Sequence, residues 1–136
     1  MSILSKLRAL WARRRPKPLD EWFFVTFDDD QVHLRAEPPG SEPWSQSFRW
    51  DSIVRVCFKA EDMWVSDGIY VFTTERPESY VIPTEANGGN ELWGEILLRK
   101  LFDAALATEA IRSTGGLFCW PTTEEASSQP RRGERE

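Results

Sequence analysis

Few residues in this sequence of 136 have the type and spacing that catalytic or metal chemistry needs. His33 is the only histidine, and no further ligand stands near it at the short spacing of a histidine metal site. No Ser-His-Asp set is apparent, because this histidine has no obvious nucleophile to serve. Cys57 and Cys119 each lie in an apolar stretch, so we expect two packed, unreactive thiols, with a redox or pairing role for Cys119 as the alternative. The sequence thus predicts no enzyme activity, no bound metal and no cofactor.

Two short motifs resemble ligand-binding loops but lack their defining residues. Asp28-Asp29-Asp30 could offer oxygens to a divalent ion, yet the run lacks the spaced acids, central glycine and terminal glutamate of a calcium loop. Gly88-Gly89 precedes a predicted helix, but it has neither the Lys-Ser/Thr sequel nor the preceding βαβ unit of a phosphate-binding loop. We interpret the first motif as a hairpin turn and the second as a turn before the helix.

The segment with the clearest binding chemistry is residues 1–18, which hold six basic residues and no acid. Its apolar residues recur at three- and four-residue spacing before Pro16 and Pro18, which predicts a short amphipathic helix over about residues 2–14. Apolar side chains flanked by arginines are typical of helices in the interface of an anionic membrane. The residues expected to enter that interface are Ile3, Leu4, Leu7, Arg8, Leu10, Trp11, Arg13, Arg14 and Arg15. A helix packed on the protein's own body, or a solvated tail, fits the same pattern.

The rest of the chain carries the opposite charge. Residues 19–112 hold 18 acidic and 8 basic residues, and the net charge of the whole chain is −5. An acidic surface repels phosphate backbones, so we expect no nucleic-acid partner. Two cysteines are too few for a secreted disulfide framework, and no apolar run resembles a secretion signal or a membrane span. We therefore expect a cytoplasmic protein, which residues 1–18 could hold at the inner membrane.

The elements that must position these residues follow from periodicity and breakers. Alternating and β-branched runs predict seven strands, at about residues 22–27, 31–36, 44–50, 53–60, 64–66, 69–74 and 79–82. Asp67-Gly68 predicts a two-residue hairpin between the fifth and sixth of these. Helical spacing then predicts one long helix from Asn90 to the stop at Gly115-Gly116.

These elements predict an α+β fold of about seven antiparallel strands, forming a barrel or a strongly bent sheet capped by one long C-terminal helix. The short N-terminal amphipathic helix precedes it. We expect three regions: the basic segment 1–18, a single domain over 19–121, and a disordered tail over 122–136, which lacks apolar periodicity.

Seven strands followed by one helix resemble the pleckstrin-homology-like fold. Phe48-Arg-Trp50-Asp-Ser-Ile53 looks like the aromatic strand of small bacterial members of that group, and Tyr80-Val-Ile-Pro83 is similar to their junction between the last strand and the helix. The resemblance covers about residues 21–112 and implies a barrel that serves as an interaction platform. It carries no functional residue over. A flat antiparallel sheet carrying one helix is the competing architecture.

The sequence therefore predicts a non-enzymatic binding module for an unknown protein partner, tethered to an anionic membrane surface by residues 1–18. The alternative is a soluble partner-neutralising protein, such as a small toxin-immunity protein, whose acidic, tryptophan-rich body masks a basic target.

Overall fold

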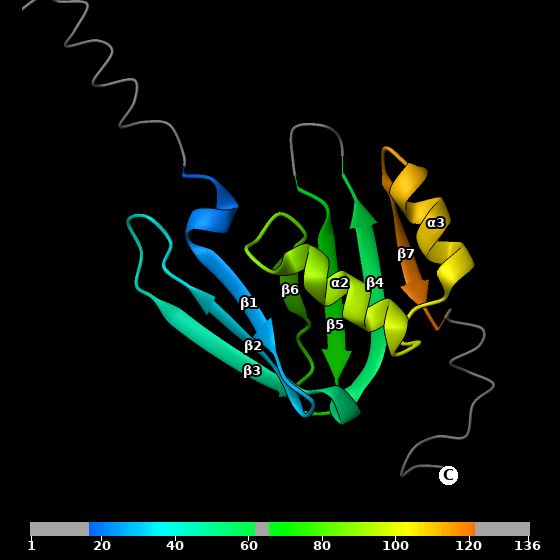
Figure 1. The fold of residues 1–136 in the computed structure, drawn as a ribbon, viewed down its shortest axis with the longest axis horizontal. Coiled ribbons are helices and arrows are strands. Elements are labelled where there is room, and N and C mark those ends of the chain that lie inside the picture. Colours follow the sequence, from blue (N-terminus) through cyan, green and yellow to red (C-terminus); the bar gives the residue numbers. More distant parts are fainter. Residues whose placement is uncertain (1–16, 62–65, 122–136) are drawn as a thin grey trace, which may run out of the picture.

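The computed structural model describes residues 17–61 and 66–121. The predicted N-terminal helix and the predicted disordered tail lie outside these residues. The described chain forms two antiparallel sheets, one of three strands and one of four, with two α-helices (Figure 1). In chain order the elements are η1 (Leu19–Glu21), β1 (Phe23–Phe27), β2 (Gln31–Ala36), β3 (Trp44–Arg49), η2 (Trp50–Ser52), β4 (Ile53–Ala60), β5 (Gly68–Thr73), β6 (Tyr80–Pro83), α2 (Gly89–Leu98), α3 (Ala104–Arg112) and β7 (Gly116–Trp120).

The three-stranded sheet has the order β1-β2-β3 and buries alternate residues of β1 and β2, whereas β3 buries only Phe48. Val32 and Leu34 of β2 lie opposite Phe48 and Gln46 of β3, and Val32 also lies opposite Phe27 of β1. This alternation of buried and accessible positions is the pattern from which the strands were predicted. The first three predicted strands are thus confirmed, except that Trp22 precedes β1 and Trp50 belongs to η2 and not to β3.

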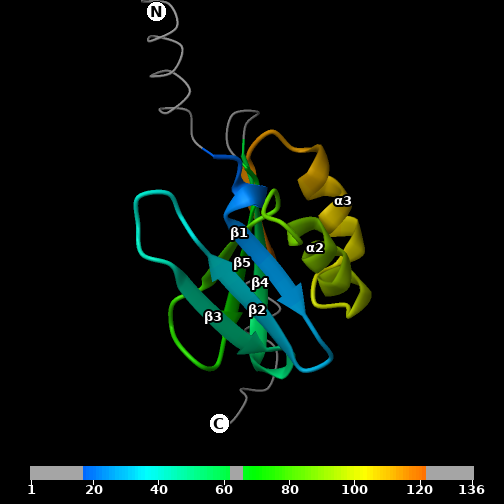
Figure 2. The same ribbon diagram turned by 60° about the vertical axis from the view of Figure 1, so that its left-hand side comes forward.

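The four-stranded sheet has the order β6-β5-β4-β7 and supplies the other half of the core. Its inner face buries Val56, Phe58, Ala60, Ile69, Val71, Tyr80 and Ile82. Phe48 stacks on Tyr80 with ring centroids 4.6 Å apart, which joins the two sheets. Trp93 of α2 lies between Phe58 and Phe102, at 4.9 and 5.0 Å. α2 and α3 therefore close the same side of the sheet (Figure 2).

The glycine pair before α2 is required by close packing. Gly88 has φ of 91°, and a Cβ there would lie 2.1 Å from the carbonyl oxygen of Val25. Backbone hydrogen bonds from Val25 to Asn87 and from Asn87 to Phe23, 2.7 and 2.8 Å long, fasten this loop to the edge of β1. The interpretation of Gly88-Gly89 as a turn is confirmed for Gly88 only, because Gly89 is the first residue of α2, which lacks the expected side-chain cap from Asn90.

The single long helix predicted from Asn90 is wrong, because the chain breaks at Lys100. The backbone N–H groups of Lys100 and Leu101 donate to the carbonyls of Leu97 and Ile96, and Lys100 has φ of 61°. This bond pattern with a left-handed residue is a Schellman motif, which ends a helix even though lysine stands where glycine is usual. The carboxylate of Asp103 then accepts from the N–H of Leu106 and caps α3.

The fold also differs from the prediction after α3 and between β4 and β5. The last element within the described residues is a strand, β7, and not a helix. Asp67-Gly68 is not a two-residue hairpin: Gly68 opens β5, and the Asp67 carboxylate accepts from the N–H of Glu61. Of the strand predicted at 64–66, residues 64 and 65 lie outside the described part, and Ser66 is not in a strand. The described residues form two separate sheets and not a closed barrel.

Candidate functional site

All nine residues predicted to enter a membrane interface lie within residues 1–16, outside the part that the structure describes. Their role stays a prediction. Three other surfaces of the described body carry possible binding or catalytic chemistry: the turn between β1 and β2, a cavity beside that turn, and the side of the four-stranded sheet that faces away from the helices.

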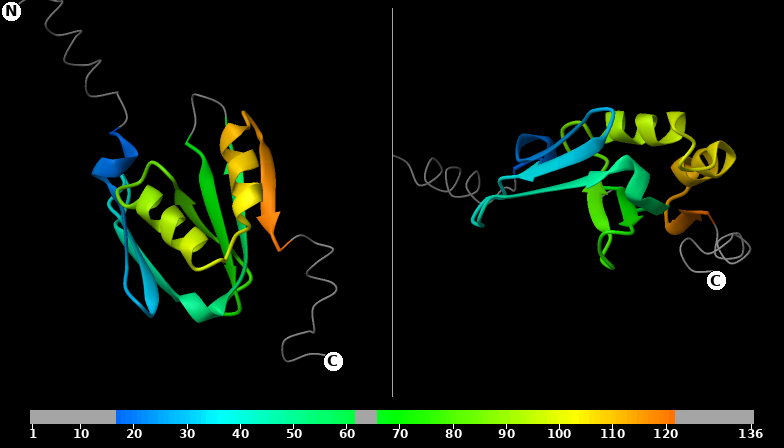
Figure 3. Two further views of the ribbon diagram at one scale, coloured as in Figure 1. Left: turned by 45° about the vertical axis from the view of Figure 1, so that its right-hand side comes forward. Right: turned by 90° about the horizontal axis from the view of Figure 1, so that it is seen from below.

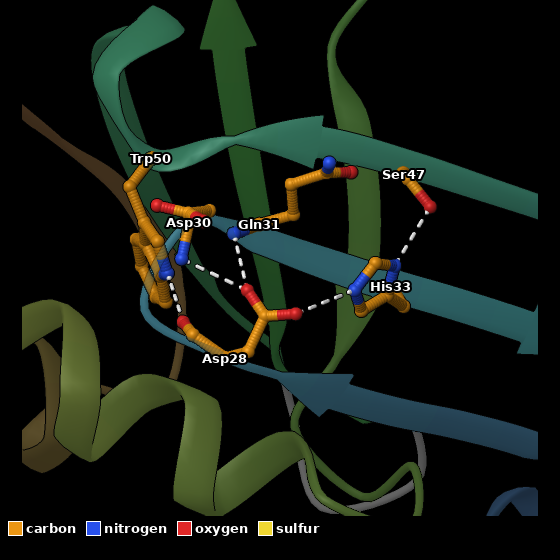
Figure 4. A network of polar contacts seen from close by, with 6 residues as sticks. All are labelled: Asp28, Asp30, Gln31, His33, Ser47 and Trp50. Carbon is orange, nitrogen blue, oxygen red and sulfur yellow. Dashed lines mark hydrogen bonds and ion pairs between the residues drawn. The ribbon is translucent and has the colours of Figure 1, made fainter.

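The turn between β1 and β2 is organised by the carboxylate of Asp28 (Figure 4). Its Oδ1 accepts hydrogen bonds from the backbone N–H groups of Asp30 and Gln31, both 2.8 Å long. The indole N–H of Trp50 donates to the Asp28 carbonyl at 2.8 Å. The bonds from Gln31 and Asp30, followed by that from His33, lower the pKa of the Asp28 carboxyl from its ordinary value of 3.8. The interpretation of Asp28-Asp29-Asp30 as a hairpin turn is confirmed.

A serine, a histidine and an aspartate meet on the accessible face of the three-stranded sheet, which the sequence did not reveal. His33 Nδ1 lies 2.9 Å from Ser47 Oγ, and His33 Nε2 lies 3.3 Å from Asp28 Oδ2. The prediction that the chain has no Ser-His-Asp set is therefore wrong, because these three side chains lie close together. His33 and Ser47 are direct cross-strand partners, and only the register of β2 and β3 brings them together.

The geometry of this set favours a structural role over hydrolysis. In Ser-His-Asp hydrolases Nε2 faces the serine and Nδ1 faces the aspartate, whereas the His33 ring is turned the other way. The side chains of His33 and Asp28 are 42% and 62% exposed, so water competes for both. The adjoining cavity is lined by other residues. We interpret the set as a polar network that fixes the turn.

That cavity, of about 340 Å³, lies at the end of the molecule where the β1–β2 turn meets η2 and the junction of α2 and α3. Its lining consists of Asp29, Asp30, Arg49, Trp50, Asp51, Arg99 and Leu101. The Arg49 guanidinium donates two bonds of 3.0 Å to the Asp51 carboxylate, which raise the pKa of Arg49 and lower that of Asp51.

The second arginine of the cavity is also paired. Arg99 Nε donates to Glu95 at 2.8 Å, and its guanidinium lies 4.0 Å from the centroid of the Trp50 ring. Asp29 and Asp30 form no ion pair with any described residue. The cavity therefore carries unbalanced negative charge beside a buried indole ring that Arg99 already covers, and this charge suits an ammonium or guanidinium group. Within residues 17–61 and 66–121, no three His, Cys, Asp or Glu side chains gather to hold a metal ion.

The third surface is the outer face of the four-stranded sheet, meaning the side turned away from α2 and α3 (Figure 3). Two hollows of about 450 and 250 Å³ lie on it and share Cys57, Phe72 and Leu117 in their linings. We define the outer face by the outward residues of its strands: Arg55, Cys57, Lys59, Tyr70, Phe72, Val81, Leu117 and Cys119. Most of these are apolar, so the sheet is apolar on both sides.

Cys57 of β4 and Cys119 of the edge strand β7 form a disulfide bond on this face. The prediction of two separate packed thiols is wrong, and the pairing role weighed for Cys119 is the one that the structure has. The two residues are 62 positions apart and become direct neighbours only because β7 returns beside β4. Since the strand at 116–120 was not predicted, nothing in the sequence indicated this proximity.

Comparisons with protein-family models, curated proteins and solved structures found no match. The search for a membrane-spanning helix also found none among the described residues.

Proposed function

We propose that the protein is a non-enzymatic binding module that residues 1–18 attach to an anionic membrane surface. The charge distribution along the chain is the observation that carries this proposal. Six bases and no acid stand in these residues, whereas residues 19–112 hold 18 acids and 8 bases. Such a separation of charge, with apolar residues at helical spacing in the basic segment, suits attachment of one segment to a surface that repels the rest.

The energies support attachment by this segment. Each base near an anionic leaflet contributes about 1 kcal/mol, and partial burial of the apolar residues adds a few kcal/mol more. Repulsion of the acidic body falls off within a Debye length of about 8–10 Å. Within the segment, Pro16-Lys-Pro18 gives a spacer between the predicted helix and η1.

Co-sedimentation with vesicles tests this function in the full chain. We expect binding to vesicles of equal parts phosphatidylglycerol and phosphatidylcholine, and much weaker binding to phosphatidylcholine alone. Leu7→Ser with Trp11→Ser, called the tether variant, should release the protein. The control variant is Leu98→Ser with Ile111→Ser, which removes two apolar side chains that are exposed on α2 and α3. A wild-type protein that stays in the supernatant with anionic vesicles at low salt would contradict the proposal.

The end cavity favours a second candidate, a soluble protein that masks a basic partner. Its unpaired Asp29 and Asp30 beside Trp50 could receive an arginine or lysine side chain. Calorimetric titration with an arginine-rich peptide tests this. Asp29→Asn with Asp30→Asn should weaken binding, whereas Glu42→Gln with Glu109→Gln, two exposed acids elsewhere, should change it much less. Equal weakening by both pairs would show that the peptide responds to the net charge of the protein and not to the end cavity.

A further inference from the structure

We infer that the outer face of the four-stranded sheet is a second membrane-contact surface, which lies on the same anionic bilayer as residues 1–18. The inference rests on the proposed function and deepens it, because it assigns a surface of the folded body to the same ligand. Three features of the outer face carry it: its apolar character, its arrangement in rows, and the sign of its charge.

The outer face is apolar where a solvated sheet would be polar. An antiparallel sheet with one face in water normally alternates apolar and polar residues. In β5 the buried residues Ile69 and Val71 alternate instead with Tyr70 and Phe72, which are only partly covered. Leu117 of β7 is 62% exposed and Val81 of β6 is 46% exposed. Strands that are apolar on both faces are typical of sheets covered on both faces.

The strand register places these residues in adjoining rows. Val81, Tyr70, Cys57 and Cys119 are successive cross-strand partners, so one row crosses all four strands. Phe72 and Arg55 are partners in the next row, and Leu117 and Lys59 are partners on the other side. Partnered residues point to the same side of a sheet. With strands about 4.8 Å apart, the row forms a continuous strip about 14 Å wide.

The charged residues of this face are mainly basic although the body is acidic. Arg55 lines one of its hollows and Lys59 the other. Among residues 17–61 and 66–121, the one acid that pairs with them is Glu61, 3.4 Å from the Lys59 ammonium. The acids of the end cavity lie instead around the β1–β2 turn. Apolar and aromatic side chains with basic residues among them suit the headgroup region of an anionic leaflet.

Two occupants from this chain fit the face less well. The segment 1–18 brings six bases toward Arg55 and Lys59, so the charges repel. A second copy that packed the same face against itself would oppose these two bases with their own copies. An anionic bilayer complements both the apolar strip and the bases. Residues 1–18 show the same combination of apolar and basic residues, so one ligand accounts for both features.

Vesicle affinity separates this inference from the proposed function. The face variant is Val81→Ser with Leu117→Ser, which changes exposed positions that the fold does not bury. Its match is the control variant Leu98→Ser with Ile111→Ser, since these residues are 75% and 63% exposed on the helices. We expect the face variant to bind vesicles of phosphatidylglycerol and phosphatidylcholine about tenfold more weakly than the control variant. Equal urea midpoints of the two variants would show that both fold alike.

A charge reversal tests the same face without removing an apolar side chain. Lys59→Glu should weaken binding about tenfold at low salt, because a base near the leaflet becomes an acid. Arg112→Glu makes the same change of charge on α3 and should have a much smaller effect. The comparison of Lys59→Glu with Arg112→Glu still tests the outer face even if Val81→Ser with Leu117→Ser fails to fold.

Each outcome has one meaning. If the tether variant releases the protein while face and control variants bind equally and Lys59→Glu matches Arg112→Glu, the inference is overturned, the proposed function stands, and the outer face is left to a protein partner. If the tether variant binds like wild type while the face variant is weakened, the tether fails and the face contact stands. A wild-type protein that binds no anionic vesicles overturns both.

Discussion

Single carboxylates and single backbone angles decide much of the local structure. Asp28 is the clearest case, because one side chain holds two backbone N–H groups of its own turn and reaches His33 on the next strand. Asn and Asp favour such turns because their side chains can replace a missing backbone bond. The Asp28 carbonyl of this turn also accepts the indole N–H of Trp50, and Trp50 forms one wall of the end cavity.

We predict that Asp28→Ala lowers the urea midpoint at neutral pH more than Asp29→Ala does, since the structure shows no comparable bonds for the Asp29 side chain. The folded-state pKa of Asp28 lies below its ordinary value of 3.8. Its contribution to stability is therefore complete above that value and is lost as pH falls through the folded pKa. The difference between wild type and Asp28→Ala should shrink in acid. A difference that stays constant with pH would contradict this explanation.

Lys100 is a second decisive residue, because its φ of 61° lies in the left-handed region. This conformation costs a residue with a Cβ about 1–2 kcal/mol. We predict that Lys100→Gly raises the free energy of unfolding by roughly 0.5–1 kcal/mol, after the greater freedom of glycine in the unfolded chain is subtracted. Lys100→Ala is the control, because it removes the same charge but keeps the Cβ. If alanine stabilises as much as glycine, backbone strain is not the cause.

At the scale of elements, periodicity predicted the strands well and their partners poorly. β2 and β4 were predicted with the bounds that they have, because β2 alternates strictly and β4 is rich in β-branched residues. The helical spacing of apolar residues that predicted the long helix includes Trp93 and Ile96, and both are buried. It failed beyond Leu98, because a left-handed lysine ends α2 and sequence patterns expect glycine at that position.

The candidate sites were less predictable than the elements, for a physical reason. His33 meets Ser47 through register, and Cys57 meets Cys119 through the return of β7. Neither pairing leaves a local pattern, because cross-strand neighbours can be any distance apart in the sequence. The apolar outer face was not predicted, although Tyr70 and Phe72 break the polar alternation of a solvated strand. The basic segment 1–18 was visible because its charge and spacing are local.

The disulfide holds an edge strand that pairs with β4 alone. Cross-linking residues 62 positions apart restricts the unfolded chain, and a loop of that length contributes about 4 kcal/mol in the loop-entropy estimate. We predict that Cys57→Ala with Cys119→Ala lowers the free energy of unfolding by about 3–4 kcal/mol under oxidising conditions. Wild type in a dithiol reductant should then unfold near the midpoint of the variant. Identical midpoints of oxidised and reduced wild type would show that the bond adds no stability.

In the proposed function an acidic body is combined with two basic, apolar membrane contacts, so the proposed attraction to a membrane must depend on salt. Residues 1–18 supply six bases, and the outer face adds Arg55 and Lys59. The 18 acids and 8 bases of residues 19–112 leave the body as a whole repelled by an anionic leaflet. In this proposal, attraction of the basic surfaces opposes repulsion of the acidic body. Neutralising some of the bases in residues 1–18 should therefore weaken binding to an anionic membrane.

We predict that Arg13→Gln, Arg14→Gln and Arg15→Gln together weaken binding to phosphatidylglycerol vesicles about a hundredfold at low salt, at about 1 kcal/mol for each base. At 1 M salt the Debye length falls to about 3 Å, so this difference should nearly vanish. The tether variant, Leu7→Ser with Trp11→Ser, removes apolar area and should lose affinity by a similar factor at every salt concentration. Parallel salt curves for wild type and the arginine variant would show that these bases do not face the lipid. Residues 1–18 would then be interpreted as a helix packed on the acidic body, where their arginines pair with carboxylates in place of lipid headgroups.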